Sequence, residues 1–173
     1  MQESSFGWAE FARARPLVDA GYAGVLLVVT GALAWVTGEA FVFPSLGPTA
    51  YLLATVHTEI QTGRRVIGGH LIGVAAGLLA YHTIAGGLSI VAAHPSYSGA
   101  QFRLIASGVV SVVLTTAGMR TTGTEHAPAC ATTLIVSLGL LSTAEEAGFI
   151  LVSVCLLYVA HLVGKRGVDA LVG

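Results

Sequence analysis

The chain has 173 residues, of which 54% are hydrophobic and only 10% are charged, and its mean hydropathy is +0.80. Soluble domains carry about 25% charged residues, so this composition excludes an ordinary water-soluble domain and predicts helices that lie in a lipid bilayer. The net charge of −1 leaves no basic surface for nucleic acid. Cys130 and Cys155 stand apart without a CxxC motif. We interpret them as small hydrophobic residues, neither a disulfide nor a metal site.

Four apolar stretches have about the 20 residues that a helix needs to cross a bilayer. In chain order they are 20–37, 66–93, 103–120 and 148–164. We interpret the first as a transmembrane helix and not as a signal peptide, because Glu3 and Asp19 lie where a signal peptide would be positively charged. Two further stretches, 40–56 and 126–141, are apolar but are interrupted by proline and small residues.

Lysine and arginine favour the cytoplasmic side of multi-pass proteins. If all six stretches cross and the N-terminus is cytoplasmic, most basic residues fall on that side: Arg13, Arg15, Arg64, Arg65, Arg120, Lys165 and Arg166. We therefore predict a multi-pass protein of the cell (plasma or inner) membrane. Its expected parts are a cytoplasmic segment at 1–19, a transmembrane domain at 20–164 and a cytoplasmic tail at 165–173. The alternative, in which the interrupted stretches enter and return on one side, stays open.

The two halves of the chain have the same order of segments: a long apolar stretch, an interrupted one and another long one. A shift of 83 residues places Thr49 on Thr132 and Gly47 on Cys130. Three crossings in each half turn the second half upside down relative to the first. We therefore predict an all-α membrane fold of two inverted repeats, at about 20–93 and 103–164.

Interrupted helices at membrane depth are costly, because an unpaired backbone group in hydrocarbon costs several kcal/mol. Pro48 and Pro128 suit the first turn of a helix, so each interrupted stretch predicts a half-helix that begins near the bilayer centre. Inverted symmetry would bring the two N-termini face to face, where free N–H groups and the helix dipoles can bind a small anion. The predicted anion-binding residues are Ser45, Leu46, Gly47, Thr49, Ala50, His126, Ala129, Cys130, Ala131, Thr132 and Thr133. The alternative is that the prolines only kink helices that hold no ligand.

Three segments carry a resemblance to a known family: FPSLGPTAYLLA, GRRVIGGHLIG and EHAPACATTLIV. Together they resemble the HPP family of small integral membrane proteins, over roughly residues 20–164. His126 matches the histidine of the family signature and Pro128 its second proline, whereas Ala127 and Cys130 replace a proline and a glycine. The family is usually described with four transmembrane helices. The resemblance implies passage of nitrite or a related small monovalent anion.

His70 and Glu125 are the predicted supporting residues of the site, beside the anion-binding His126. His126 and Glu125 adjoin the second interrupted stretch, and an ionisable residue at membrane depth is a functional candidate. His126 could hold the anion when protonated or relay a proton with it; the alternative is a neutral histidine packed against the loop. For His70 a hydrogen bond to an interrupted stretch and a purely structural role are both open. The glycines at 69, 73 and 77 predict close helix packing, and the remaining histidines lack metal-ligand spacing.

We therefore expect a channel or transporter for a small monovalent anion, first of all nitrite, with no cofactor or metal and no enzymatic activity. Its expected partners are the anion, the lipid bilayer and a second copy of the chain, because 173 residues are few for a transporter. One alternative is a membrane scaffold or sensor that transports nothing. The other is an intramembrane enzyme that uses Ser45, His70, His126 and Glu125, although these residues have no nucleophile–base spacing. The sequence leaves open whether passage is channel-like or coupled.

Overall fold

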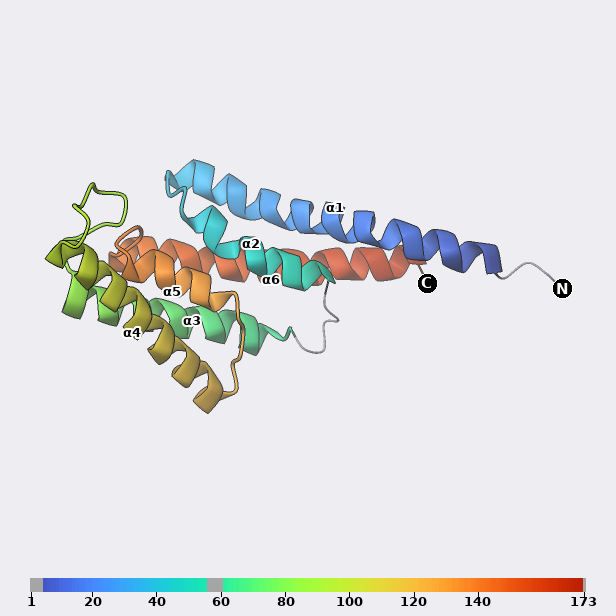
Figure 1. The fold of residues 1–173 in the computed structure, drawn as a ribbon. Helices are drawn as coiled ribbons and strands as arrows, with labels where there is room; N and C mark the ends of the chain where they lie inside the picture. The colour runs from blue at the N-terminus through green and yellow to red at the C-terminus, as the bar shows by residue number, and fades with distance from the viewer. Residues whose placement is uncertain (1–4, 56–60, 173) are drawn as a thin grey trace.

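The computed structural model describes residues 5–55 and 61–172, and these form six α-helices and one π-helical turn (Figure 1). The elements are α1 (Ser5–Thr37), α2 (Val42–Thr55), α3 (Gly63–Ala80), the π-helical turn η1 (Tyr81–Ala85), α4 (Gly99–Thr122), α5 (Ala129–Ser137) and α6 (Ala144–Val172). This order confirms the all-α fold.

Four of these helices are long and apolar enough to cross a membrane: Pro16–Thr37, Gly63–Ala85, Gly99–Thr122 and Ala144–Lys165. They correspond to the four long stretches expected from the sequence. The second of those stretches was predicted too long, because the helix ends at Ala85 and residues 86–93 belong to a connection that turns at Gly87. α1 and α6 continue past the predicted membrane limits, so those limits fall inside helices and not in linkers.

The two interrupted stretches form the short helices α2 and α5, of 14 and 9 residues. At 1.5 Å per residue they are about 21 and 14 Å long, too short to cross the hydrocarbon core alone. The expected start of the first half-helix at Pro48 is wrong, because α2 begins at Val42 and continues through Pro44 and Pro48. Pro44 is tolerated because residues in the first turn of a helix need no N–H donor, and Pro48 removes one hydrogen bond from the helix interior. α5 begins one residue after Pro128, as expected.

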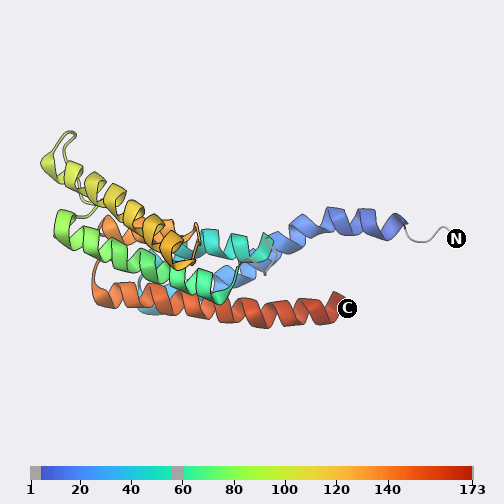
Figure 2. The same ribbon diagram turned by 90° about the horizontal axis from the view of Figure 1, so that it is seen from below.

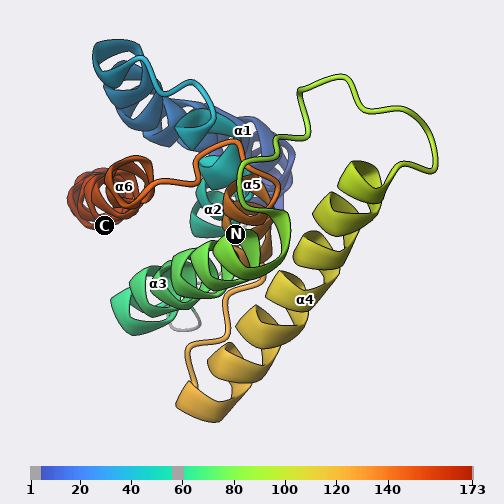
Figure 3. The same ribbon diagram turned by 90° about the vertical axis from the view of Figure 1, so that its left-hand side faces the viewer.

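Successive helices alternate in direction, and α4 is steeply inclined to the others (Figures 1 and 3). The start of α1 and the end of α6 lie at the same end (Figure 1). These two helix ends extend beyond the rest of the bundle (Figure 2). In the end-on view α5 lies near the centre, and it contacts α2, α3 and α4 (Figure 3). The chain thus places its two short helices inside the bundle, and α2 and α5 run in opposite directions there (Figure 1).

An apolar core holds α1, α2 and α6 together. Its wholly buried side chains include Leu26 on α1, Leu46 on α2, and Ile150 and Leu157 on α6. Many large apolar side chains point outward instead, such as Trp35, which is 87% exposed. Outward apolar residues of this kind fit a lipid environment, since in water they would form costly exposed patches.

Glycines on one face of α3 let α5 pack against it closely. A Cβ atom at Gly73 would lie 2.9 Å from the carbonyl oxygen of Ala129, and one at Gly77 would lie 3.0 Å from that of Thr133. Only residues without side chains fit so near another backbone. The expected use of these glycines for helix packing is confirmed.

A capping box starts α6. The Thr143 N–H donates to Glu146 Oε2 at 2.8 Å, and the Glu146 N–H donates to Thr143 Oγ1 at 3.2 Å. The two side chains thereby satisfy two N–H groups that the helix leaves without partners.

We expect Thr143→Ala to lower the free energy of unfolding in detergent by about 1 kcal/mol, because one of these caps is lost. Thr121→Ala is the matched control, since the Thr121 hydroxyl is exposed and bonds only to carbonyls of its own helix. A chemical denaturation series on both variants measures the difference. Equal midpoints for Thr143→Ala and Thr121→Ala would contradict the capping role.

Candidate functional site

Five polar side chains form one continuous hydrogen-bonded chain inside the bundle, here called the polar chain. His126 Nδ1 lies 3.0 Å from Gln61 Oε1, and His126 Nε2 lies 3.1 Å from Thr49 Oγ1. Thr49 Oγ1 also lies 2.9 Å from His70 Nε2, and His70 Nδ1 lies 2.8 Å from Thr132 Oγ1. The polar chain therefore runs Gln61, His126, Thr49, His70, Thr132.

These five side chains come from three helices and two connections. Gln61 precedes α3 and His70 lies within it, Thr49 lies on α2, Thr132 lies on α5, and His126 lies in the connection between α4 and α5. The polar chain therefore ties both short helices to α3.

The polar chain is almost completely buried. Thr49, His70 and Thr132 are 0% exposed, His126 is 2% exposed and Gln61 is 8% exposed. A buried polar group costs free energy unless it is hydrogen-bonded. Each of the four ring nitrogens of His70 and His126 has a partner, so the polar chain satisfies both rings completely. Gln61 is the member of the chain that reaches nearest to the outside.

The Gln61 oxygen fixes the direction of every hydrogen in the chain when both histidines are neutral. A carbonyl oxygen only accepts, so His126 Nδ1 donates to Gln61 and His126 Nε2 must accept from the Thr49 hydroxyl. Thr49 Oγ1 then accepts from His70 Nε2, and His70 Nδ1 accepts from the Thr132 hydroxyl. All four hydrogens point toward Gln61. Turning the Gln61 amide would reverse every one of them.

Gly69 lets the connection that carries His126 lie directly against α3. A Cβ atom at Gly69 would lie 2.9 Å from His126 Cβ and 3.1 Å from the carbonyl oxygen of Thr124. The ring centroids of His70 and His126 are consequently only 5.2 Å apart. Gly69 thus leaves space for His126, and the next residue in the sequence is His70, the other histidine of the polar chain.

The backbone at the start of α5 differs from the prediction. The N–H groups of Ala129, Cys130 and Ala131 were expected to be free for an anion. They donate instead to the carbonyl oxygens of His126, Ala127 and Pro128 at 3.0 to 3.1 Å. The tight turn before α5 satisfies them, since it places a carbonyl three residues back within reach of each. Donors for a ligand here have to come from side chains.

Several other predicted residues of the anion site lie outside the polar chain. Leu46 and Ala50 lie in the apolar core, and the Ser45 hydroxyl donates to the carbonyl oxygen of Val42 at 2.7 Å. Gly47 has no atom within 4 Å of where its Cβ would be. The structure therefore brings neither Ser45 nor Gly47 to the polar chain through a hydrogen bond.

Thr133 and Glu125 lie beside the polar chain and not in it. The Thr133 hydroxyl donates to the carbonyl oxygen of Ala129 at 3.0 Å and lies 2.9 Å from the hydroxyl of Thr115 on α4. Glu125 is exposed, and it lies 3.8 Å from Arg120. The structure gives Thr133 a role in joining α4 to α5. Glu125 precedes His126 in the chain, but its carboxylate lies toward Arg120 and the His126 ring bonds to Thr49 and Gln61 instead.

Sequence reasoning missed Gln61, the outer end of the polar chain. It also missed a third buried histidine, His161 on α6. The Tyr22 hydroxyl of α1 donates to the His161 carbonyl oxygen at 3.0 Å and lies 3.1 Å from its Nδ1. The chain has only three glutamines and no asparagine, so an amide side chain directly before a membrane helix was the available signal for Gln61. No motif marks Tyr22 or His161.

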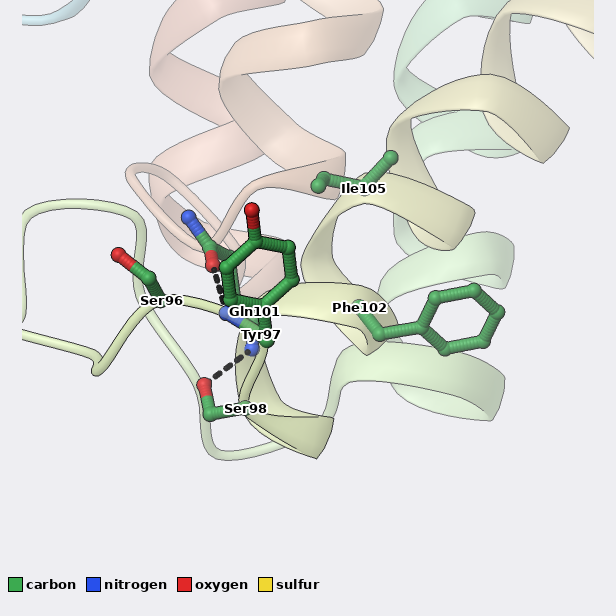
Figure 4. Close-up of a pocket in the computed structure, with 6 residues that line it drawn as sticks. All are labelled: Ser96, Tyr97, Ser98, Gln101, Phe102 and Ile105. Carbon is green, nitrogen blue, oxygen red and sulfur yellow. Dashed lines mark hydrogen bonds between the residues drawn. The ribbon is translucent and has the colours of Figure 1, made fainter.

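A surface pocket lies at the start of α4, away from the polar chain. Figure 4 shows its lining residues, Ser96, Tyr97, Ser98, Gln101, Phe102 and Ile105. The Ser98 hydroxyl accepts from the Gln101 N–H at 3.2 Å, which caps α4. The polar chain adjoins the opposite end of the same helix, where the Met119 sulfur would lie 3.4 Å from a Cβ atom at Gly69. The pocket therefore belongs to the cap and connection, not to the candidate site.

A scan against family models matches residues 13–167 to the family described as HPP, transmembrane region. The chain belongs to the HPP family. It is a multi-pass membrane protein, and its four long helices agree with the usual description of HPP proteins. Comparisons with curated proteins and with solved structures gave no match. The three segments that carry the HPP resemblance each contribute to the polar chain, through Thr49, His70, and His126 with Thr132.

Proposed function

We propose that this HPP protein is a channel or transporter for a small monovalent anion, with nitrite as the first candidate. The anion passes at the polar chain. One observation carries the proposal: three separate family segments meet there in a wholly buried cluster of hydroxyls and imidazoles. Polar residues inside a membrane bundle are expensive and mark ion or substrate pathways. An apolar core would hold these helices together as well.

The donors that we propose for the anion are side chains. The hydroxyls of Thr49 and Thr132 can rotate toward a ligand, and the two imidazoles can each present an N–H group. The N-terminus of α5 adds a partial positive charge beside Thr132, since the dipole of a helix favours anions at that end. The hydroxyls and the helix dipole replace the free backbone N–H groups that the sequence suggested.

The inverted repeat is part of the same proposal. Thr49 and Thr132 are equivalent under the shift of 83 residues, and they bond to the two different nitrogens of His70, Nε2 and Nδ1. α2 and α5 are both short and run in opposite directions (Figure 1). These features support two half-helices related by a pseudo-two-fold axis in the membrane plane, with His70 close to that axis.

A transport role fits the site better than an enzymatic one. Thr49, His126 and Gln61 have the order of a nucleophile, a base and an orienting group, but Thr49 is 0% exposed and its hydroxyl is shared with His70. We propose that the protein is not an enzyme, that it works as a homodimer in the cell membrane, and that both termini are cytoplasmic. The mass of the detergent-solubilised protein tests the dimer.

An uptake panel in proteoliposomes tests the function. We expect the wild-type protein to carry nitrite faster than nitrate, chloride or formate, above the leak of protein-free vesicles. His126→Ala should lower nitrite uptake about tenfold or more, because a hydrogen bond to a charged group is worth about 1.5–3 kcal/mol. His82→Ala is the matched control, since His82 is exposed on the same bundle. If no anion moves under either a pH gradient or a voltage, the protein is a scaffold or sensor.

A further inference from the structure

We propose that the polar chain is a proton path and that each anion crosses together with one proton. This inference rests on the proposed function and names its coupling ion. Its basis is geometric: four consecutive hydrogen bonds of 2.8 to 3.1 Å join Gln61 to Thr132 without a gap. Each internal member both donates and accepts, which is the requirement for passing a proton along a chain of hydrogen bonds.

The path runs from near the bundle surface to its interior. Gln61 lies just before α3, where Thr62 caps the helix and Arg64 follows. Thr132 lies at the start of α5, which is central in the end-on view (Figure 3). A proton can therefore reach or leave the middle of the bundle through side chains alone, without an open pore.

One passage conserves atoms and charge. The acid form of the anion gives a proton to Thr132 Oγ1, while Thr132 gives its own hydrogen to His70 Nδ1. His70 Nε2 gives its hydrogen to Thr49, Thr49 gives its hydrogen to His126 Nε2, and His126 releases its Nδ1 hydrogen to water beside Gln61. One proton enters, one leaves, and the deprotonated anion remains to leave separately. Every hydrogen then points toward Thr132, and the Gln61 amide turns to match. A proton that passes in the opposite direction restores the first arrangement, and this return moves no net proton across the membrane while the anion site is open to the same side as Gln61.

The surroundings of the two rings favour an extra proton that passes through the polar chain over one that stays bound to a ring. The rings of His70 and His126 bond to Thr49, Gln61 and Thr132, which are all uncharged, and the two rings are 5.2 Å apart. Two charged imidazoles so close in a buried site would repel each other strongly. The single line of hydrogens thus carries one proton at a time.

Charged and titratable groups also lie on the elements around the pair. α3 begins with Arg64 and Arg65, and Arg64 donates to the Thr122 carbonyl oxygen. Arg120 of α4 faces Glu125 in solvent. α2 carries the exposed Tyr51, α5 carries the partly buried Cys130, and α6 carries Tyr158, His161 and Lys165 toward its C-terminal end. The hydrogen bonds of the two rings go to none of these groups.

The test measures nitrite and proton movement together in proteoliposomes that contain a pH-sensitive dye, with the voltage set by potassium and valinomycin. We expect one proton for each nitrite, uptake driven by a pH gradient alone, and no response to voltage. Thr49→Val keeps the side-chain shape and removes the link between the rings, so the proton-driven uptake should fall about tenfold or more. Thr115→Val removes a buried hydroxyl outside the polar chain and should keep the 1:1 ratio.

The outcomes separate the two proposals. Nitrite that moves with its charge and without protons would overturn the proton path and leave the transport function standing. If no anion moves, the transport function fails, and nitrogen-15 NMR of the histidines in bilayers still decides the path. The path requires a hydrogen on Nε2 of His70 and on Nδ1 of His126, or the reverse on both. The same tautomer in both rings breaks the line of hydrogens and would overturn the proposal.

Discussion

His70→Ala is expected to lower the free energy of unfolding in detergent by about 3–5 kcal/mol. The ring is 0% exposed, and its removal leaves a cavity where α2, α3 and α5 meet. It also leaves the buried hydroxyl of Thr132 without its partner, which adds the cost of an unsatisfied polar group. Denaturant titration of the purified protein, followed by far-UV circular dichroism, measures the loss.

Two further variants make this prediction specific. His82→Ala removes an exposed histidine and should change stability by no more than about 0.5 kcal/mol. His70→Gln offers one amide in place of two ring nitrogens. Its free energy of unfolding should lie between those of His70→Ala and the wild type. A His70→Ala protein as stable as His82→Ala would show that the polar chain does not hold the short helices in place.

The length and composition of the apolar stretches made much of the fold predictable. Four apolar stretches became four long helices, and the proline-containing stretches became two short ones. The start of α2 was not predictable from Pro48, because the cost of a proline inside a helix was overcome by burial of Val42 and Leu46 in the apolar core. Tertiary packing decides such boundaries, and a sequence does not reveal which neighbours a helix will have.

The central side chains of the candidate site were predictable, but its outer end at Gln61 and the bonded N–H groups at the start of α5 were not. Family motifs pointed to Thr49, His70, His126 and Thr132, and the polar chain joins all four. The expectation that backbone N–H groups would be free failed, because the turn before α5 provides three carbonyl acceptors that only a three-dimensional structure reveals. Gln61 was missed for a similar reason. It lies 65 residues from His126 in the sequence, and no pattern predicts their contact.

Gly73→Ala is expected to destabilise the protein by about 1–3 kcal/mol, although alanine normally favours a helix over glycine by about 1 kcal/mol. The new Cβ would lie 2.7 Å from Thr133 Oγ1 and 2.9 Å from the carbonyl oxygen of Ala129. One of these neighbours is backbone, so α5 itself has to move away from α3. Thermal unfolding in detergent measures the effect.

The same displacement should reach the site. Thr132 is next to Thr133 on α5, and its bond to His70 is 2.8 Å long, so a shift of α5 would lengthen it and lower nitrite uptake together with stability. Gly24→Ala is the matched control, because a Cβ atom at Gly24 meets no atom within 4 Å and α1 should become slightly more stable. If Gly73→Ala behaves like Gly24→Ala in both measurements, α3 and α5 are not packed backbone to backbone, and the histidines of the polar chain are not held at the spacing on which the proposed proton path depends.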